Sequence, residues 1–191
     1  PTEAPESTVA PTEAVAVEPT KAEGPCLIVG ALYVGSVKDA GYNQAMHESV
    51  MSIKENIPCV EIIEAENIPE GPDAEKTMQT MIDQGAKLIF PTSFGHMEPA
   101  YALAEKHFID DGNNRIILAT DGDLNVGVSD EGSLARLVEE KKQGGVFLSV
   151  LGFGTGNLKD AKMEKLADHG NGNYAYIDSL GEARKVFVQQ M

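Results

Sequence analysis

The fold follows from the stretch Cys26-Leu-Ile-Val-Gly-Ala-Leu-Tyr-Val34, which contains no charged residue. An apolar run of this kind is typical of a strand that is buried on both faces of a parallel sheet. A polar loop follows it, and then Ala45, Met46, Val50 and Ile53 recur at helical spacing. The stretch therefore predicts the first strand and the first crossover helix of an α/β domain.

The alternation of strand and helix continues along the chain. Further strands are expected over 59–65, 87–91, 115–120, 146–153 and 174–177, and helices over 41–56, 72–85, 98–108, 133–143, 160–169 and 180–190. Strands that alternate with helices imply a parallel sheet with helices on both faces. The sequence thus predicts one three-layer, doubly wound α/β domain over 25–191, of the flavodoxin or Rossmann type. Its mostly parallel, six-stranded sheet is expected in the order 2-1-3-4-5-6.

The first 25 residues differ in composition from the rest. They are rich in Pro, Thr, Glu and Ala and contain no aromatic residue. Such a segment cannot bury enough apolar surface to offset the entropy of ordering it, so we expect a disordered tether over 1–25. It would either hold an extracytoplasmic domain off a lipid anchor or be an ordinary linker or unstructured terminus.

The charge of the chain limits its partners. Thirty acidic residues against 15 basic ones give a net charge of −15. Phosphate binding needs clustered Lys and Arg, so we expect neither nucleic acid nor an anionic membrane as a partner. No apolar run approaches the roughly 18 residues of a membrane-spanning helix. Membrane contact is therefore expected only through a lost N-terminal lipid anchor, and the charge is compatible with a cation or a neutral small molecule.

The stretches Ile28-Val-Gly-Ala-Leu-Tyr-Val-Gly-Ser-Val-Lys-Asp-Ala-Gly-Tyr-Asn-Gln-Ala45 and Ala86-Lys-Leu-Ile-Phe-Pro-Thr-Ser-Phe-Gly95 carry a resemblance. Over residues 25–106 the chain resembles the basic membrane protein family of substrate-binding lipoproteins, which deliver nucleosides or purines to ABC importers. The resemblance implies a non-enzymatic, extracytoplasmic protein, periplasmic or at the cell surface, that binds a small molecule. By position it assigns ligand contacts to Asp39, Tyr42 and Asn43, with Ser93, Phe94 and Gly95 on the other side of the site.

The first three of these residues also have a structural interpretation. Tyr42 would pack at the start of a helix that Asp39 caps. The family closes two lobes over its ligand, whereas here only the first half of one lobe precedes the second resemblance. Because an open half-cleft buries little ligand surface, we expect weak affinity for a purine or nucleoside.

Residues 101–191 resemble the back half of a bacterial von Willebrand factor A domain. The matching stretches cover 114–127, 147–157 and 170–178. The resemblance implies an adhesion or interaction module that binds a protein ligand through Mg²⁺. Of the family's metal ligands only the Asp of a Thr-Asp-Gly turn is present, as Asp121. Ser36, Asp39 and Asp123 are the other candidate ligands, but Mg²⁺ requires near-octahedral oxygen ligands, so the metal site is incomplete.

The two resemblances meet within residues 98–113 and divide the domain into halves, 25–106 and 107–191. This join suggests an engineered, recombined or artefactual chimera, and a folded scaffold without any ligand is the third alternative. The four histidines have no metal-ligand spacing, and no Gly-x-Ser-x-Gly motif occurs. We therefore expect no catalytic activity.

The two cysteines, Cys26 and Cys59, open the first two expected strands, which should be neighbours. A disulfide would need Cα atoms about 4.4–6.8 Å apart and would fit an oxidising, extracytoplasmic setting. The stagger of parallel strands favours the alternative, two small buried thiols.

Overall fold

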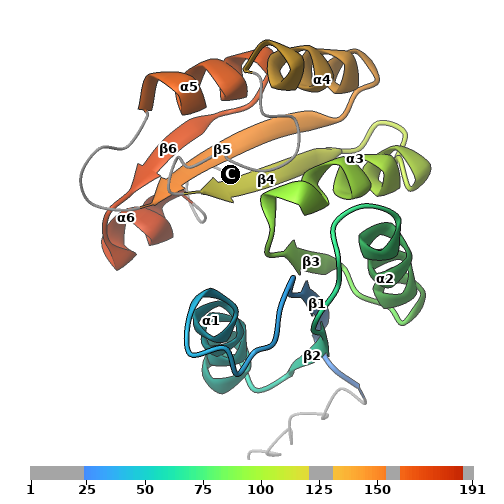
Figure 1. Ribbon diagram of the computed structural model, residues 1–191, viewed down its shortest axis with the longest axis vertical. Coiled ribbons are helices and arrows are strands. Elements are labelled where there is room, and N and C mark those ends of the chain that lie inside the picture. The colour runs from blue at the N-terminus through green and yellow to red at the C-terminus, as the bar shows by residue number, and fades with distance from the viewer. Residues whose placement is uncertain (1–23, 121–130, 154–159, 187–191) are drawn as a thin grey trace, which may run out of the picture.

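The computed structural model describes residues 24–120, 131–153 and 160–186 (Figure 1). Strands and helices alternate as expected. The strands are β1 (Leu27–Leu32), β2 (Val60–Ala65), β3 (Leu88–Pro91), β4 (Arg115–Thr120), β5 (Phe147–Phe153) and β6 (Tyr174–Ile177). The helices are α1 (Tyr42–Asn56), α2 (Pro72–Asp83), the short 3₁₀ turn η1 (Phe94–His96), α3 (Met97–Lys106), α4 (Glu131–Gln143), α5 (Asp160–His169) and α6 (Leu180–Lys185). Within these ranges no helix has the length and apolar character needed to cross a membrane.

The strands form two parallel three-stranded sheets, ordered β2-β1-β3 and β4-β5-β6. Figure 1 shows the two sheets apart from each other, the first coloured blue to green and the second yellow to red. The order inside each sheet agrees with the sequence prediction, but the prediction of a single six-stranded sheet is wrong, because β3 does not pair with β4. Strand β3 has only four residues, and Pro91 lacks an N–H group, so its outer edge offers few hydrogen bonds.

Helix α3 contributes to the cores of both sheets. Its Leu103 packs with Met78 and Met81 of α2 in the core of the first sheet. Its Tyr101 packs with Leu148 of β5 in the core of the second. Figure 1 shows α3 between the two sheets. One amphipathic helix thus joins the halves that β3 and β4 leave unpaired.

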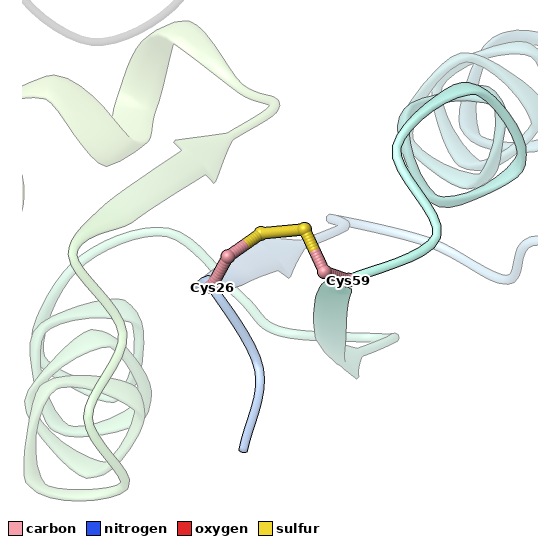
Figure 2. The surroundings of a disulfide bond; sticks show 2 residues. All are labelled: Cys26 and Cys59. Carbon is pink, nitrogen blue, oxygen red and sulfur yellow. A yellow bond between two sulfur atoms is a disulfide. The ribbon is translucent and has the colours of Figure 1, made fainter. Parts of the chain in front are cut away.

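Cys26 and Cys59 form a disulfide (Figure 2). Their Cα atoms lie 5.3 Å apart, so the expectation of two buried thiols is wrong. The register pairs Leu27 with Val60, which places the two preceding residues opposite each other. The Cys26 amide donates a hydrogen bond to the Cys59 carbonyl at 2.9 Å. The bridge therefore fastens the starts of β1 and β2 and closes a loop that contains α1.

The unpaired edges of β3 and β4 carry exposed apolar side chains. Leu88 and Phe90 of β3 are 42% and 36% exposed, and Ile117 of β4 is 45% exposed. Ile89 and Ile116, which alternate with them, pack instead against the helix-covered cores. Exposed apolar side chains therefore lie on the face of each strand that the core helices leave uncovered.

Candidate functional site

The candidate site lies at the carboxyl ends of β1 and β3, where parallel α/β sheets bind ligands. These strands are neighbours, so the loops that follow them lie side by side. The Tyr42 hydroxyl donates a hydrogen bond to the Thr92 carbonyl at 2.5 Å, and the Thr92 hydroxyl donates to the Leu32 carbonyl at 2.9 Å. The structure thus brings Tyr42 next to the loop that contains the predicted residues of the other side.

Tyr42 is the first residue of α1 and is 55% exposed. Its hydroxyl is held across the site, so the orientation of the ring is fixed while much of its surface faces solvent. An exposed, oriented aromatic ring of this kind can stack on a flat ligand.

Asp39 caps helix α1. Its Oδ1 accepts from the Gly41 amide at 2.8 Å and the Gln44 amide at 3.2 Å, and its Oδ2 accepts from the Asn43 amide at 3.2 Å and Asn43 Nδ2 at 2.8 Å. The hydrogen bond from the Asn43 side chain, followed by those from backbone amides, lowers the pKa of Asp39 to about 2. This carboxylate therefore serves the helix start, as the structural interpretation anticipated.

Asn43 is buried and completes the same network. Its Oδ1 accepts from the Gly35 amide at 3.2 Å, and its Nδ2 donates to Asp39. Both ends of the amide are thus used in holding the loop after β1 against α1. Ligand contact by Asp39 and Asn43 stays a prediction.

Replacing Asp39 with Ala should lower the free energy of unfolding by an amount that depends on pH. The pKa of Asp39 is depressed on folding, so its stabilising contribution is present above the ordinary Asp pKa and is lost as pH falls through about 2. Urea unfolding of wild type and Asp39→Ala should differ steadily above about pH 4 and converge toward about pH 2. Asp39→Asn, which keeps an acceptor oxygen, is the control, and its free energy of unfolding should lie between those of wild type and Asp39→Ala. A difference in unfolding free energy between wild type and Asp39→Ala that does not change with pH would contradict the capping role of the Asp39 carboxylate.

On the other side of the site, Ser93 and Gly95 contact a glutamate that follows β2. The Ser93 hydroxyl donates to Glu70 Oε1 at 2.6 Å. A Cβ atom built on Gly95 would lie only 2.1 Å from Glu70 Cδ, so the Glu70 carboxylate rests directly on the Gly95 backbone. Phe94 begins η1 and packs against the core of the second sheet. Ligand contact by Ser93, Phe94 and Gly95 stays a prediction.

A second glutamate covers the loop after β1. Glu66 Oε2 accepts from the Ser36 hydroxyl and from the Val37 amide, both at 3.0 Å. The hydrogen bond from the Val37 amide, and then that from Ser36, lowers the pKa of Glu66. Sequence reasoning missed both Glu66 and Glu70. Their signal was their place just after the second strand, which ends at the same edge of the sheet as β1 and β3.

A further cluster joins β1, β2 and α1. The hydroxyl of buried Tyr33 donates to Glu64 Oε1 at 2.6 Å, and His47 Nδ1 lies 2.7 Å from the same oxygen. Burial is the main cause of a raised Tyr33 pKa, with the Glu64 contact second. The cluster holds α1 against the sheet one helical turn beyond Tyr42 and Asn43.

The predicted metal site is only partly described. Asp121 and Asp123 lie outside the described residues, and no group of three or more His, Cys, Asp or Glu side chains within the described ranges could hold a metal. Ser36 donates to Glu66, and Asp39 caps α1. These two residues follow β1 of the first sheet, whereas Asp121 follows β4 of the second. A Mg²⁺ site therefore stays a prediction.

Two curated proteins match parts of the chain. It is 50% identical over 95 residues to the uncharacterized protein YfbK of Escherichia coli (strain K12), covering 50% of this chain and 16% of that protein. It is 39% identical over 84 residues to a purine-binding protein of Brucella abortus (strain 2308), covering 42% of this chain and 23% of that protein. The chain thus spans less than a quarter of the length of either relative.

A solved structure and a family model also match. The VWA domain of SpRpn10 is similar with a TM-score of 0.39 and 14% identity, over 79% of this chain and 87% of that one. The model of the Bmp family, described as ABC transporter substrate-binding protein PnrA-like, matches residues 27–109. The substrate-binding resemblance stated from the sequence thus recurs among known proteins. The segment that holds the loops after β1 and β3 is similar to substrate-binding proteins of ABC transporters.

Proposed function

We propose that this chain is a non-enzymatic binding protein that takes a purine or nucleoside at the loops after β1 and β3. The observation that carries the proposal is the exposed ring of Tyr42, fixed by its hydrogen bond to Thr92 within the segment that matches the substrate-binding family. The similarity to a purine-binding protein supports the same ligand class.

The residues around Tyr42 suit a neutral, flat ligand. The ring would stack on a base, and Ser36 and Ser93 lie in the loops that follow β1 and β3. Stacking on one aromatic side chain contributes roughly 1–3 kcal/mol. Because the site is open on the side of Tyr42 that faces solvent, we expect a dissociation constant above about 10 µM.

The disulfide supports an extracytoplasmic location for this binding protein. Bridges such as Cys26–Cys59 form and persist in oxidising compartments and are rare in the cytosol. Substrate-binding proteins of ABC transporters work in such compartments, so the location and the proposed ligand class agree.

Calorimetric titration with adenosine and guanosine tests the proposal. Tyr42→Ala should weaken binding roughly 5- to 150-fold, the equivalent of one lost stacking contact. Tyr42→Phe, which keeps the ring but loses the hydrogen bond to Thr92, should weaken binding less. Tyr176→Ala is a matched control, because Tyr176 is a 38% exposed tyrosine of the second sheet. The absence of heat with both nucleosides would contradict the proposal.

A further inference from the structure

We propose that Glu66 and Glu70 form a carboxylate latch that occupies the hydrogen-bond donors of the site and that ligand must displace. The latch regulates the site described above, so the identity of its ligand rests on the proposed function. The contacts that define the latch are independent of that function.

The two glutamates hold donors on both loops of the site. Glu66 accepts hydrogen bonds from the Ser36 hydroxyl and the Val37 amide in the loop after β1. Glu70 accepts a hydrogen bond from the Ser93 hydroxyl after β3, and its carboxylate rests on Gly95. A ligand that stacks on Tyr42 and reaches for these donors therefore meets a carboxylate on either side.

The backbone that carries the latch is anchored. The amides of Asn67 and Ile68 donate to the carbonyls of Gly35 and Tyr33 at 3.2 and 2.9 Å. His96 Nε2 lies 3.3 Å from the Ile68 carbonyl, where its N–H can donate. Asn67 and Gly71 have φ angles of 58° and 95°, so the segment turns sharply on either side of Glu70. The glutamate side chains can therefore swing away while their backbone stays in place.

The contacts of the latch are suited to reversible release. The hydrogen bonds of Glu66 and Glu70 to their serines are exposed to water, and exposed interactions of this kind are individually weak. When only the open fraction of a protein binds ligand, the apparent dissociation constant rises by the inverse of that fraction. A latch that is about 90% closed therefore weakens binding about tenfold.

Titration of variants with adenosine and guanosine tests the latch. The double variant Glu66→Ala/Glu70→Ala should bind about tenfold more tightly than wild type. Glu55→Ala/Glu61→Ala is the matched control, because it removes two exposed carboxylates outside the site with the same change in net charge. Equal affinities of the double variant and the control would overturn the latch. So would a gain seen for nucleoside monophosphates but not for the uncharged nucleosides, since that pattern reports charge repulsion.

Amide hydrogen exchange without ligand separates the latch from the proposed function. The Val37 amide should exchange several-fold faster in Glu66→Ala than in Glu61→Ala, because it loses its acceptor. An unchanged rate would overturn the latch whether or not nucleosides bind. If no variant bound a nucleoside, the proposed function would be contradicted. The Val37 exchange rate would then decide the latch by itself.

Discussion

Reduction of the Cys26–Cys59 disulfide should lower the free energy of unfolding by roughly 3–4 kcal/mol. The bridged residues are 33 positions apart, and in the chain-entropy model the bridge restricts the unfolded chain by an amount set by that separation. For a protein of this size the change corresponds to a fall in melting temperature of roughly 6–16 °C. The loss should be large because the bridge fastens the two strands between which α1 crosses.

Differential scanning calorimetry with and without a reductant measures this effect. The variant Cys26→Ser/Cys59→Ser should melt at the temperature of the reduced wild type and should not respond to the reductant. Both cysteines lie at exposed positions, so serine is tolerated there. A wild-type melting temperature that is insensitive to reduction would contradict a stabilising bridge.

Truncation of Tyr101 on α3 should have a comparable or larger effect. Tyr101 is fully buried in the core of the second sheet, and replacing a buried aromatic residue with Ala costs about 3–5 kcal/mol. Leu103→Ala removes the side chain that the same helix contributes to the first sheet's core and should cost about 2–5 kcal/mol. Urea unfolding followed by circular dichroism gives both values.

The shape of these unfolding curves reports whether α3 couples the two sheets. If it does, Tyr101→Ala and Leu103→Ala should each shift one cooperative transition. A transition split in two by either variant would show that the sheets unfold independently. Glu98→Ala, at an exposed position of α3, is the control and should change stability by less than about 0.5 kcal/mol. Tyr101→Phe should be tolerated, because the Tyr101 hydroxyl is buried without a hydrogen-bond partner among the described residues.

The elements could be predicted because local pattern determines them. The bounds of β4, α5 and β6 agree with the sequence prediction, and Met78 and Met81 are buried as their helical spacing indicated. The joining of the two sheets could not be predicted in this way. It depends on the edge of a four-residue strand that ends in Pro91 and on how α3 divides its side chains between two cores.

The candidate site was predictable in part for the same reason. The spacing of Asp39 and Tyr42 at a helix start already indicated a cap, and the structure shows that cap. The partners of Ser36 and Ser93 lie 30 and 23 positions away along the chain, in Glu66 and Glu70. Contacts at such separations follow from how strands β1, β2 and β3 are ordered, which local spacing does not reveal.

The unpaired edges of β3 and β4 also bear on self-association. Exposed strand edges flanked by Leu88, Phe90 and Ile117 can add a strand from another molecule, which is the usual route to edge-to-edge aggregation. The net charge of −15 opposes this by repulsion between copies. Salt screens such repulsion beyond about 10 Å at 0.1 M. The acidity of the chain thus acts as a solubility device, and it protects the open edges best at low ionic strength.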